Sequence, residues 1–119
     1  MIHTLHLFLA FVSAVVVALA GLEAGLRLVR NRKPGTNASR LSQCVLLILG
    51  VTAASGLGMF VGGARPHELL HLLYAGLAFS AIPVTDLLAG RLSPRARGLA
   101  STVAALIGLV LLVRLFMTG

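Results

Sequence analysis

Four apolar stretches, separated by short polar segments, dominate the amino-acid sequence. Apolar residues fill about 5–29, 41–61, 69–89 and 99–116, and a helix needs about 20 such residues to cross a hydrocarbon core about 30 Å thick. The intervening segments carry arginines, together with proline, glycine, asparagine and serine. The last four residue types favour turns. The pattern therefore predicts an all-α integral membrane protein, a four-transmembrane-helix bundle that forms a single membrane domain over residues 1–119.

Composition favours lipid, rather than water, as the solvent of this chain. Of its 119 residues, 58% are hydrophobic and 11% are charged, with a mean hydropathy of +1.00, whereas soluble domains have about 45–50% and about 25%. The formal net charge is +7, but the basic residues adjoin apolar runs, where they set orientation and touch anionic headgroups. We therefore expect the lipid bilayer as a partner and no nucleic acid. The single cysteine, Cys44, excludes an internal disulfide.

Basic residues are concentrated in two of the three segments between the apolar stretches. The first segment and its flanks hold Arg27, Arg30, Arg32, Lys33 and Arg40, and the third holds Arg91, Arg95 and Arg97. The second holds only Arg65. The positive-inside rule puts the first and third segments in the cytoplasm, which predicts a multi-pass protein of the bacterial inner (plasma) membrane with both termini extracytoplasmic. The first stretch follows no basic residue and is too long for a signal-peptide core, so we expect it to be retained.

Small residues recur at a spacing of four along three of the stretches. The second has Gly50, Ala54, Gly58 and Gly62, the first has Ala14 and Ala18 and then Gly21 and Gly25, and the fourth has Ala104 and Gly108. Small residues four apart let helices approach closely in lipid. We predict that they pack the bundle, and that the glycine-rich second helix offers a contact face to a partner unless it is used internally.

Single residues add three local predictions. Pro83 lies inside the third stretch, where a proline kinks or opens a helix. Glu23 precedes Arg27 by four positions, a spacing that favours an ion pair on one helical face. Thr52 and Ser55 are expected to hydrogen-bond across helices or to their own backbone.

All four histidines fall, in this topology, at the outer ends of the first and third helices. Three charged residues come to the same level. The histidines are His3, His6, His67 and His71, and the charged residues are Arg65, Glu68 and Arg114. Since neighbouring helices in a bundle pack about 8–10 Å apart, these groups are close enough to form one site.

The first interpretation of this site is a single heme b. A heme with two histidine ligands needs one imidazole on each face of the porphyrin, from helices that face each other. His6 and His71 are the better-buried pair, with His3 and His67 as the outer alternatives. Arg114 or Arg65 would then meet the propionates as charge-assisted partners.

The second interpretation is a transition-metal ion. His67, Glu68 and His71 match the HExxH pattern of zinc proteases in the sequence HELLH, and His3 or His6 would complete a site for Zn, Cu or Fe. A protease also needs a surrounding domain, a third ligand downstream and a substrate cleft, and none is visible. We therefore rank a small HExxH membrane metalloprotease last.

The third interpretation is a quinone or lipid site. Tyr74 lies three residues beyond His71 on the same helical face, so it would serve as a hydrogen-bond partner or orient that imidazole. A further alternative needs no cofactor, because histidines at helix ends are commonly half solvated among headgroups, where polar groups cost little.

The stretch PHELLHLLYAGLAFSAIP, the short basic segment after it and the closing LLVRLFMTG resemble small uncharacterised four-helix membrane proteins of high-GC bacteria. The likeness covers mostly the second half of the chain. More distantly, the chain resembles the b-type di-heme membrane cytochromes, which carry histidines on four helices. Here all the histidines lie on one side, so the resemblance implies one heme at most.

These observations predict a small accessory subunit of a membrane electron-transfer (respiratory) complex that holds one heme b near the outer face. We expect it to pack against larger membrane-protein subunits or copies of itself, and to have no catalytic activity of its own. The alternative is a transport or metal-handling protein that uses the outer histidines.

Overall fold

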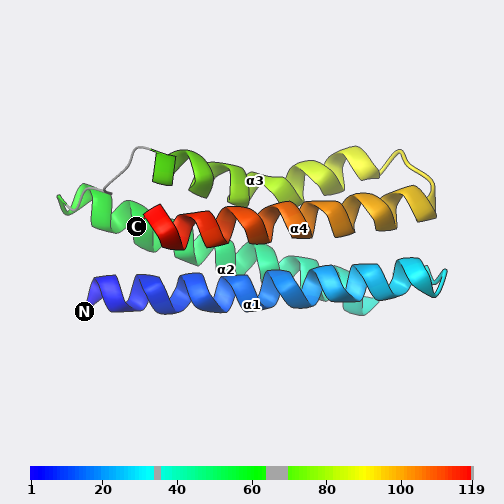
Figure 1. The fold of residues 1–119 in the computed structure, drawn as a ribbon, viewed down its shortest axis with the longest axis horizontal. Coiled ribbons are helices and arrows are strands. Elements are labelled where there is room, and N and C mark those ends of the chain that lie inside the picture. Colours follow the sequence, from blue (N-terminus) through cyan, green and yellow to red (C-terminus); the bar gives the residue numbers. More distant parts are fainter. Residues whose placement is uncertain (34–35, 64–69, 119) are drawn as a thin grey trace.

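Four antiparallel helices form an elongated bundle in a computed structural model that describes residues 1–33, 36–63 and 70–118 (Figure 1). They are α1 (Ile2–Val29), α2 (Thr36–Val61), α3 (Leu70–Ala89) and α4 (Pro94–Thr118). The bundle measures 48 × 22 × 20 Å along its principal axes. Both ends of the chain lie at one end of the bundle, and the turns after α1 and α3 lie at the other (Figure 1).

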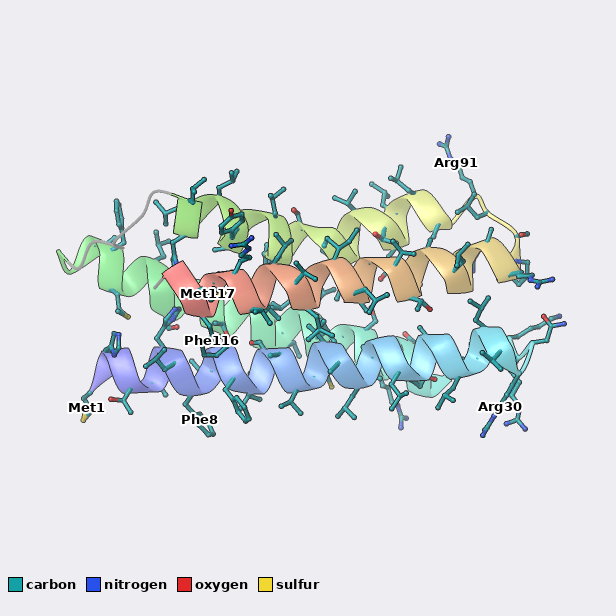
Figure 2. All side chains as sticks on the ribbon, in the orientation of Figure 1. Met1, Phe8, Arg30, Arg91, Phe116 and Met117 are labelled. Atoms are coloured by element: carbon teal, nitrogen blue, oxygen red, sulfur yellow. The ribbon has the colours of Figure 1, made fainter. Side chains whose placement is uncertain are left out.

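All four helices are long and apolar enough to cross a membrane. Large apolar side chains point outward all around the bundle: Phe8 is 63% exposed, Leu87 79% and Leu106 58%. Figure 2 shows Phe8 directed away from the other helices. Because water would penalise so much exposed apolar surface, these outer faces require lipid. The prediction of a multi-pass membrane protein built as a four-helix bundle is confirmed at this level.

Two helices begin earlier than the apolar stretches suggest. α2 begins at Thr36 rather than near 41, and α4 begins at Pro94 rather than near 99. The Ser93 side chain caps α4, since its Oγ accepts a hydrogen bond from the Ala96 N–H at 3.3 Å. Pro94 fits the first helical position because its missing N–H would have no partner there. Hydropathy marks only the lipid-exposed part of a helix, whereas backbone hydrogen bonds continue into polar residues.

The turn after α1 is closed by a Schellman motif. Asn31 adopts the left-handed conformation with φ 55°. Its N–H donates to the Leu28 carbonyl at 3.3 Å, and the Arg32 N–H donates to the Arg27 carbonyl at 3.0 Å. Asparagine is one of the few residues that tolerates this backbone conformation. The motif turns the chain sharply and holds Arg32 at the end of the bundle.

Helices α1 and α4 approach each other closely through small residues. A Cβ atom on Gly21 would stand 2.8 Å from the Cβ of Ala105, and one on Gly108 would stand 3.5 Å from Val17. The small residues of α1 and α4 therefore pack the bundle, as predicted. On α2, Gly58 is exposed, and a Cβ atom added to it would have nothing within 4 Å. The row of small residues on α2 therefore faces outward at this position.

Each helix packs against two neighbours, which leaves α1 and α3 diagonally opposite. The contact between α2 and α3 is the slightest of the four interfaces. α3 runs through Pro83 without interruption, and Figure 1 shows it bent about half-way along its length. The bend fits a proline, which removes one backbone hydrogen bond and crowds the preceding turn.

Candidate functional site

His6 is anchored to α2 through its ring. The side chain is half-buried, and its Nδ1 lies 2.8 Å from the Ser55 hydroxyl oxygen. That hydroxyl also donates to the Thr52 carbonyl at 2.7 Å. Because a serine hydroxyl has one proton, Ser55 accepts the bond from an Nδ1–H group of His6. The other ring nitrogen, Nε2, then carries the lone pair that a metal or a proton donor requires.

A glycine makes room for the same ring. A Cβ on Gly56 would stand 3.1 Å from Cε1 of His6, closer than an ordinary side-chain contact. The imidazole therefore lies directly against the backbone of α2. Ser55 and Gly56 together fix both the tautomer and the position of His6, which is a stronger restraint than a histidine among headgroups would have.

His71 approaches His6 from the diagonally opposite helix. It is half-buried, and its ring is hydrogen-bonded to the backbone of Leu115 on α4. His6 lies within electrostatic reach of His71 and also of His3, which is exposed in the first turn of α1. The structure thus brings together three of the predicted histidines, with the two half-buried ones on opposed helices.

The remaining predicted residues are divided between this cluster and the part of the chain that is not described. Tyr74 is half-buried one turn beyond His71, and Arg114 is exposed on α4. Arg65, His67 and Glu68 lie outside the described residues, so the HELLH site stays a prediction. Within residues 1–33, 36–63 and 70–118, no three histidine, cysteine, aspartate or glutamate side chains come together to hold a metal ion.

A buried pair of hydroxyls lies deeper in the bundle than His6. Ser13 on α1 and Thr52 on α2 are 2.9 Å apart through their side-chain oxygens, and both are buried. Each hydroxyl also lies within hydrogen-bond distance of a carbonyl of its own helix, Leu9 at 2.8 Å and Ile48 at 2.7 Å. Because the pair has two protons for these three contacts, only one of the two hydroxyls bonds its carbonyl while the other donates across the interface. Thr52 and Ser55 therefore have polar contacts both across helices and with their own backbone. Ser13 was not singled out, because nothing in a uniformly apolar helix shows which face turns inward.

The opposite end of the bundle holds a second feature that hydropathy did not reveal. Glu23 and Arg27 form the predicted ion pair, with 2.6 Å between Oε2 and a terminal guanidinium nitrogen. Beside them a cavity of about 760 Å³ opens between the helix ends. Of the alanines that line it, only Ala104 had been singled out in the sequence, as a helix-packing residue, and so the cavity was missed.

Comparison of the chain with protein families, with curated proteins and with solved structures finds no match. The function of this membrane protein is therefore argued from its own residues.

Proposed function

We propose that this protein is a small subunit of a membrane electron-transfer complex and holds one heme b between α1 and α3, with His6 and His71 as the axial ligands. One observation carries the proposal. Two half-buried histidines on diagonally opposed helices lie at the same end of the bundle and within electrostatic reach of each other.

The helix arrangement suits a porphyrin edge between these two ligands. α1 and α3 are separated by α2 and α4 rather than packed together. For neighbouring helices about 8–10 Å apart, the diagonal of such a bundle is about 13 Å. An imidazole from each side and a flat ring between them need a separation of this order. Adjacent helices would bring the ligands too close together.

The environment of His6 supports the ligand role. A histidine that ligates a metal usually donates its other N–H to a nearby oxygen, which fixes the tautomer and makes the ligand nitrogen more basic. Ser55 accepts such a bond at 2.8 Å. A heme b in this position supplies one-electron redox chemistry, while the protein holds the imidazoles and excludes water.

The accessory role rests on surface and size. The connections between the four membrane helices are too short to hold a soluble domain, and α2 presents Ala54 and Gly58 exposed on its outer face. Small residues there suit close packing of a helix from a larger membrane subunit or a second copy. From the positive-inside rule, we assign the histidine end to the extracytoplasmic side of the inner membrane.

The visible absorption spectrum of the purified protein tests the heme. Protein expressed with ample heme and purified in mild detergent should show a Soret band. After reduction it should also show the separate α and β bands of a low-spin ferrous heme. His6→Ala and His71→Ala should each abolish that low-spin spectrum, because one axial ligand is lost. His3→Ala is the matched control and should leave the spectrum unchanged.

A glycine pair tests the geometry independently of the ligands. Gly56→Ala should weaken heme retention, because its Cβ would press on the His6 ring at 3.1 Å, whereas Gly58→Ala, with nothing within 4 Å, should not. A wild-type protein without any Soret band refutes the proposal. Metal and quinone analysis of the same sample would then support a transition-metal ion or a quinone at these histidines instead.

A further inference from the structure

A cavity of about 760 Å³ occupies the end of the bundle opposite the histidines. All four helices line it, together with the turn after α1. Its volume falls in the range of about 300–1,000 Å³ that is usual for small-molecule sites. None of the three described histidines borders it, so it is separate from the proposed heme site.

Positive charge prevails around this cavity. Five basic side chains and two acidic ones line it. They are Arg27, Arg32, Lys33, Arg95 and Arg97, and Glu23 and Asp86. A cleft lined mainly by one sign of charge concentrates ions of the opposite sign.

The acids leave most of these cations uncompensated. Glu23 is engaged by Arg27 at 2.6 Å, and Asp86 accepts a hydrogen bond from Ser42 at 3.1 Å. In the part of the chain that the structure describes, Arg32 and Arg95 belong to no ion pair. The Nε of Arg27 is buried and has no hydrogen-bond partner. An ion in the cavity would therefore reach the exposed side chains of Arg32 and Arg95 but not this buried nitrogen.

Helix ends reinforce the positive potential. α2 and α4 begin at this end of the bundle, where the positive ends of their helix dipoles favour anions. The carbonyl end of α3 is covered, because Arg97 donates to the carbonyls of Ala89 at 3.1 Å and Gly90 at 3.3 Å. At the end of α3 the mouth therefore presents the Arg97 side chain in place of these two carbonyl oxygens.

The deeper wall of the cavity is apolar. Ala20, Ala24 and Ala104 line it from α1 and α4, and Leu46 and Ile82 line it from α2 and α3. α2 and α3 have the slightest of the four interfaces, so this side is the easiest for an acyl chain to enter. The charged mouth lies at the level of lipid headgroups, and the apolar wall lies toward the bilayer centre, where the acyl chains are. The cavity therefore matches the order of headgroup and acyl chain in a lipid of that leaflet.

We propose that this cavity binds a phosphate anion, carried by the headgroup of an anionic lipid from the surrounding leaflet. Arg27, Arg32 and Arg95 hold the phosphate as charge-assisted donors. The apolar wall between α2 and α3 receives the upper part of an acyl chain. The site is independent of the heme and depends only on the basic end of the bundle.

Native mass spectrometry of the detergent-solubilised protein tests the site. The probes are dioleoyl phosphatidylglycerol, dioleoyl phosphatidylcholine with the same chains but no net charge, and inorganic phosphate. Phosphatidylglycerol should bind at least about tenfold more tightly than phosphatidylcholine, and millimolar inorganic phosphate should not displace it. Each basic residue near an anionic lipid contributes about fivefold in affinity, so Arg32→Gln/Arg95→Gln should weaken phosphatidylglycerol binding on the order of 25-fold.

The matched control removes the same charge from the same end. Arg30 and Arg91 do not line the cavity, and Figure 2 shows both side chains extending away from the bundle. Arg30→Gln/Arg91→Gln should therefore leave phosphatidylglycerol binding within about twofold of wild type, by the same per-charge reasoning. Equal losses in the two double variants, or equal binding of the two lipids, overturn the site. Binding of inorganic phosphate alone, with the Arg32 and Arg95 dependence retained, overturns the lipid source and supports a soluble phosphate compound.

Folding is controlled by circular dichroism of both double variants. The side chains of Arg32 and Arg95 make no hydrogen bond or ion pair within the described residues. Their replacement by glutamine should therefore leave the helical signal of the protein unchanged, and a loss of lipid binding reports on the cavity.

Discussion

The imidazole of His6 and the hydroxyl of Ser55 are joined at 2.8 Å across the interface between α1 and α2. The bond connects residues 49 positions apart and fixes which ring nitrogen carries the proton. Through this contact, α2 determines which nitrogen of the His6 ring on α1 has a lone pair for a ligand.

Loss of this bond should change the redox potential of a heme held by His6. Ser55→Ala removes the acceptor of the Nδ1 proton, so the imidazole donates less electron density and stabilises the oxidised iron less. A hydrogen bond between membrane helices is worth about 0.6 kcal/mol, which corresponds to about 25 mV for one electron. A redox titration followed by absorbance should show the midpoint potential raised by this amount.

Ser80→Ala is the control for that measurement. The Ser80 hydroxyl bonds only carbonyls of its own helix, Gly76 at 2.8 Å and Leu77 at 3.3 Å. Its loss should leave the potential unchanged. A lowered potential in Ser55→Ala would contradict the assigned direction of the His6–Ser55 bond.

The buried bond between Ser13 and Thr52 should contribute to stability whether or not a cofactor binds. Thr52→Val keeps the shape of the side chain but removes its hydroxyl. We expect the free energy of unfolding in a detergent titration to fall by about 0.6 kcal/mol, and by no more than about 1.7 kcal/mol. Thr102→Val provides the comparison, because that hydroxyl bonds only the Gly98 carbonyl of its own helix at 2.9 Å. Equal losses in the two variants would show that the interhelical bond contributes nothing.

The contact between Gly21 and Ala105 should be intolerant of added volume. Gly21→Ala brings two Cβ atoms to 2.8 Å, and such overpacking costs about 1–3 kcal/mol. The same detergent titration should register this loss. Combining Gly21→Ala with Ala105→Gly moves the methyl group to the other helix and should restore most of the stability, giving a large interaction energy in the double-mutant cycle. Additive losses would exclude steric contact as the cause.

Orientation is testable with single cysteines in a Cys44→Ser background. Thr4→Cys lies at the end of the bundle where the chain termini are found, and Arg91→Cys lies at the other end. A membrane-impermeant maleimide added to intact cells should label Thr4→Cys and spare Arg91→Cys, because the basic end faces the cytoplasm. Disrupting the membrane should make both react. The opposite pattern would reverse the orientation and move the histidine cluster to the cytoplasmic side.

The helices were predictable because each span must be apolar over its whole length to cross lipid. The residues at which α2 and α4 begin were not predictable. The first turns of these helices, from Thr36 and Pro94, are polar, and hydropathy does not mark polar helical turns. The glycine and alanine spacing of α1 and α4 correctly indicated close packing. On α2 the same spacing left open whether the small residues pack the bundle or offer a contact face to a partner, and Gly58 faces outward.

The site was predictable in its residue types and not in its partners. Topology alone brought His6 and His71 to one end of the bundle. The partnership of His6 with Ser55 and Gly56 depends on how α1 and α2 are rotated about their axes, and helices that are apolar all around do not encode that rotation in a hydrophobic pattern. The cavity was missed for a related reason, since alanines such as Ala24 and Ala104 fit both a tight contact and the wall of an empty space.

The close packing of Gly21 against Ala105 joins the first helix of the chain to the last. During synthesis α1 leaves the ribosome about 80 residues ahead of the segment that covers it, at roughly 5–20 residues per second. Its small-residue face therefore spends several seconds or more in the membrane without its native neighbour. In that interval another membrane helix with a matching face competes for α1, so the order of helix insertion, as well as final stability, determines how much correctly assembled protein a cell obtains.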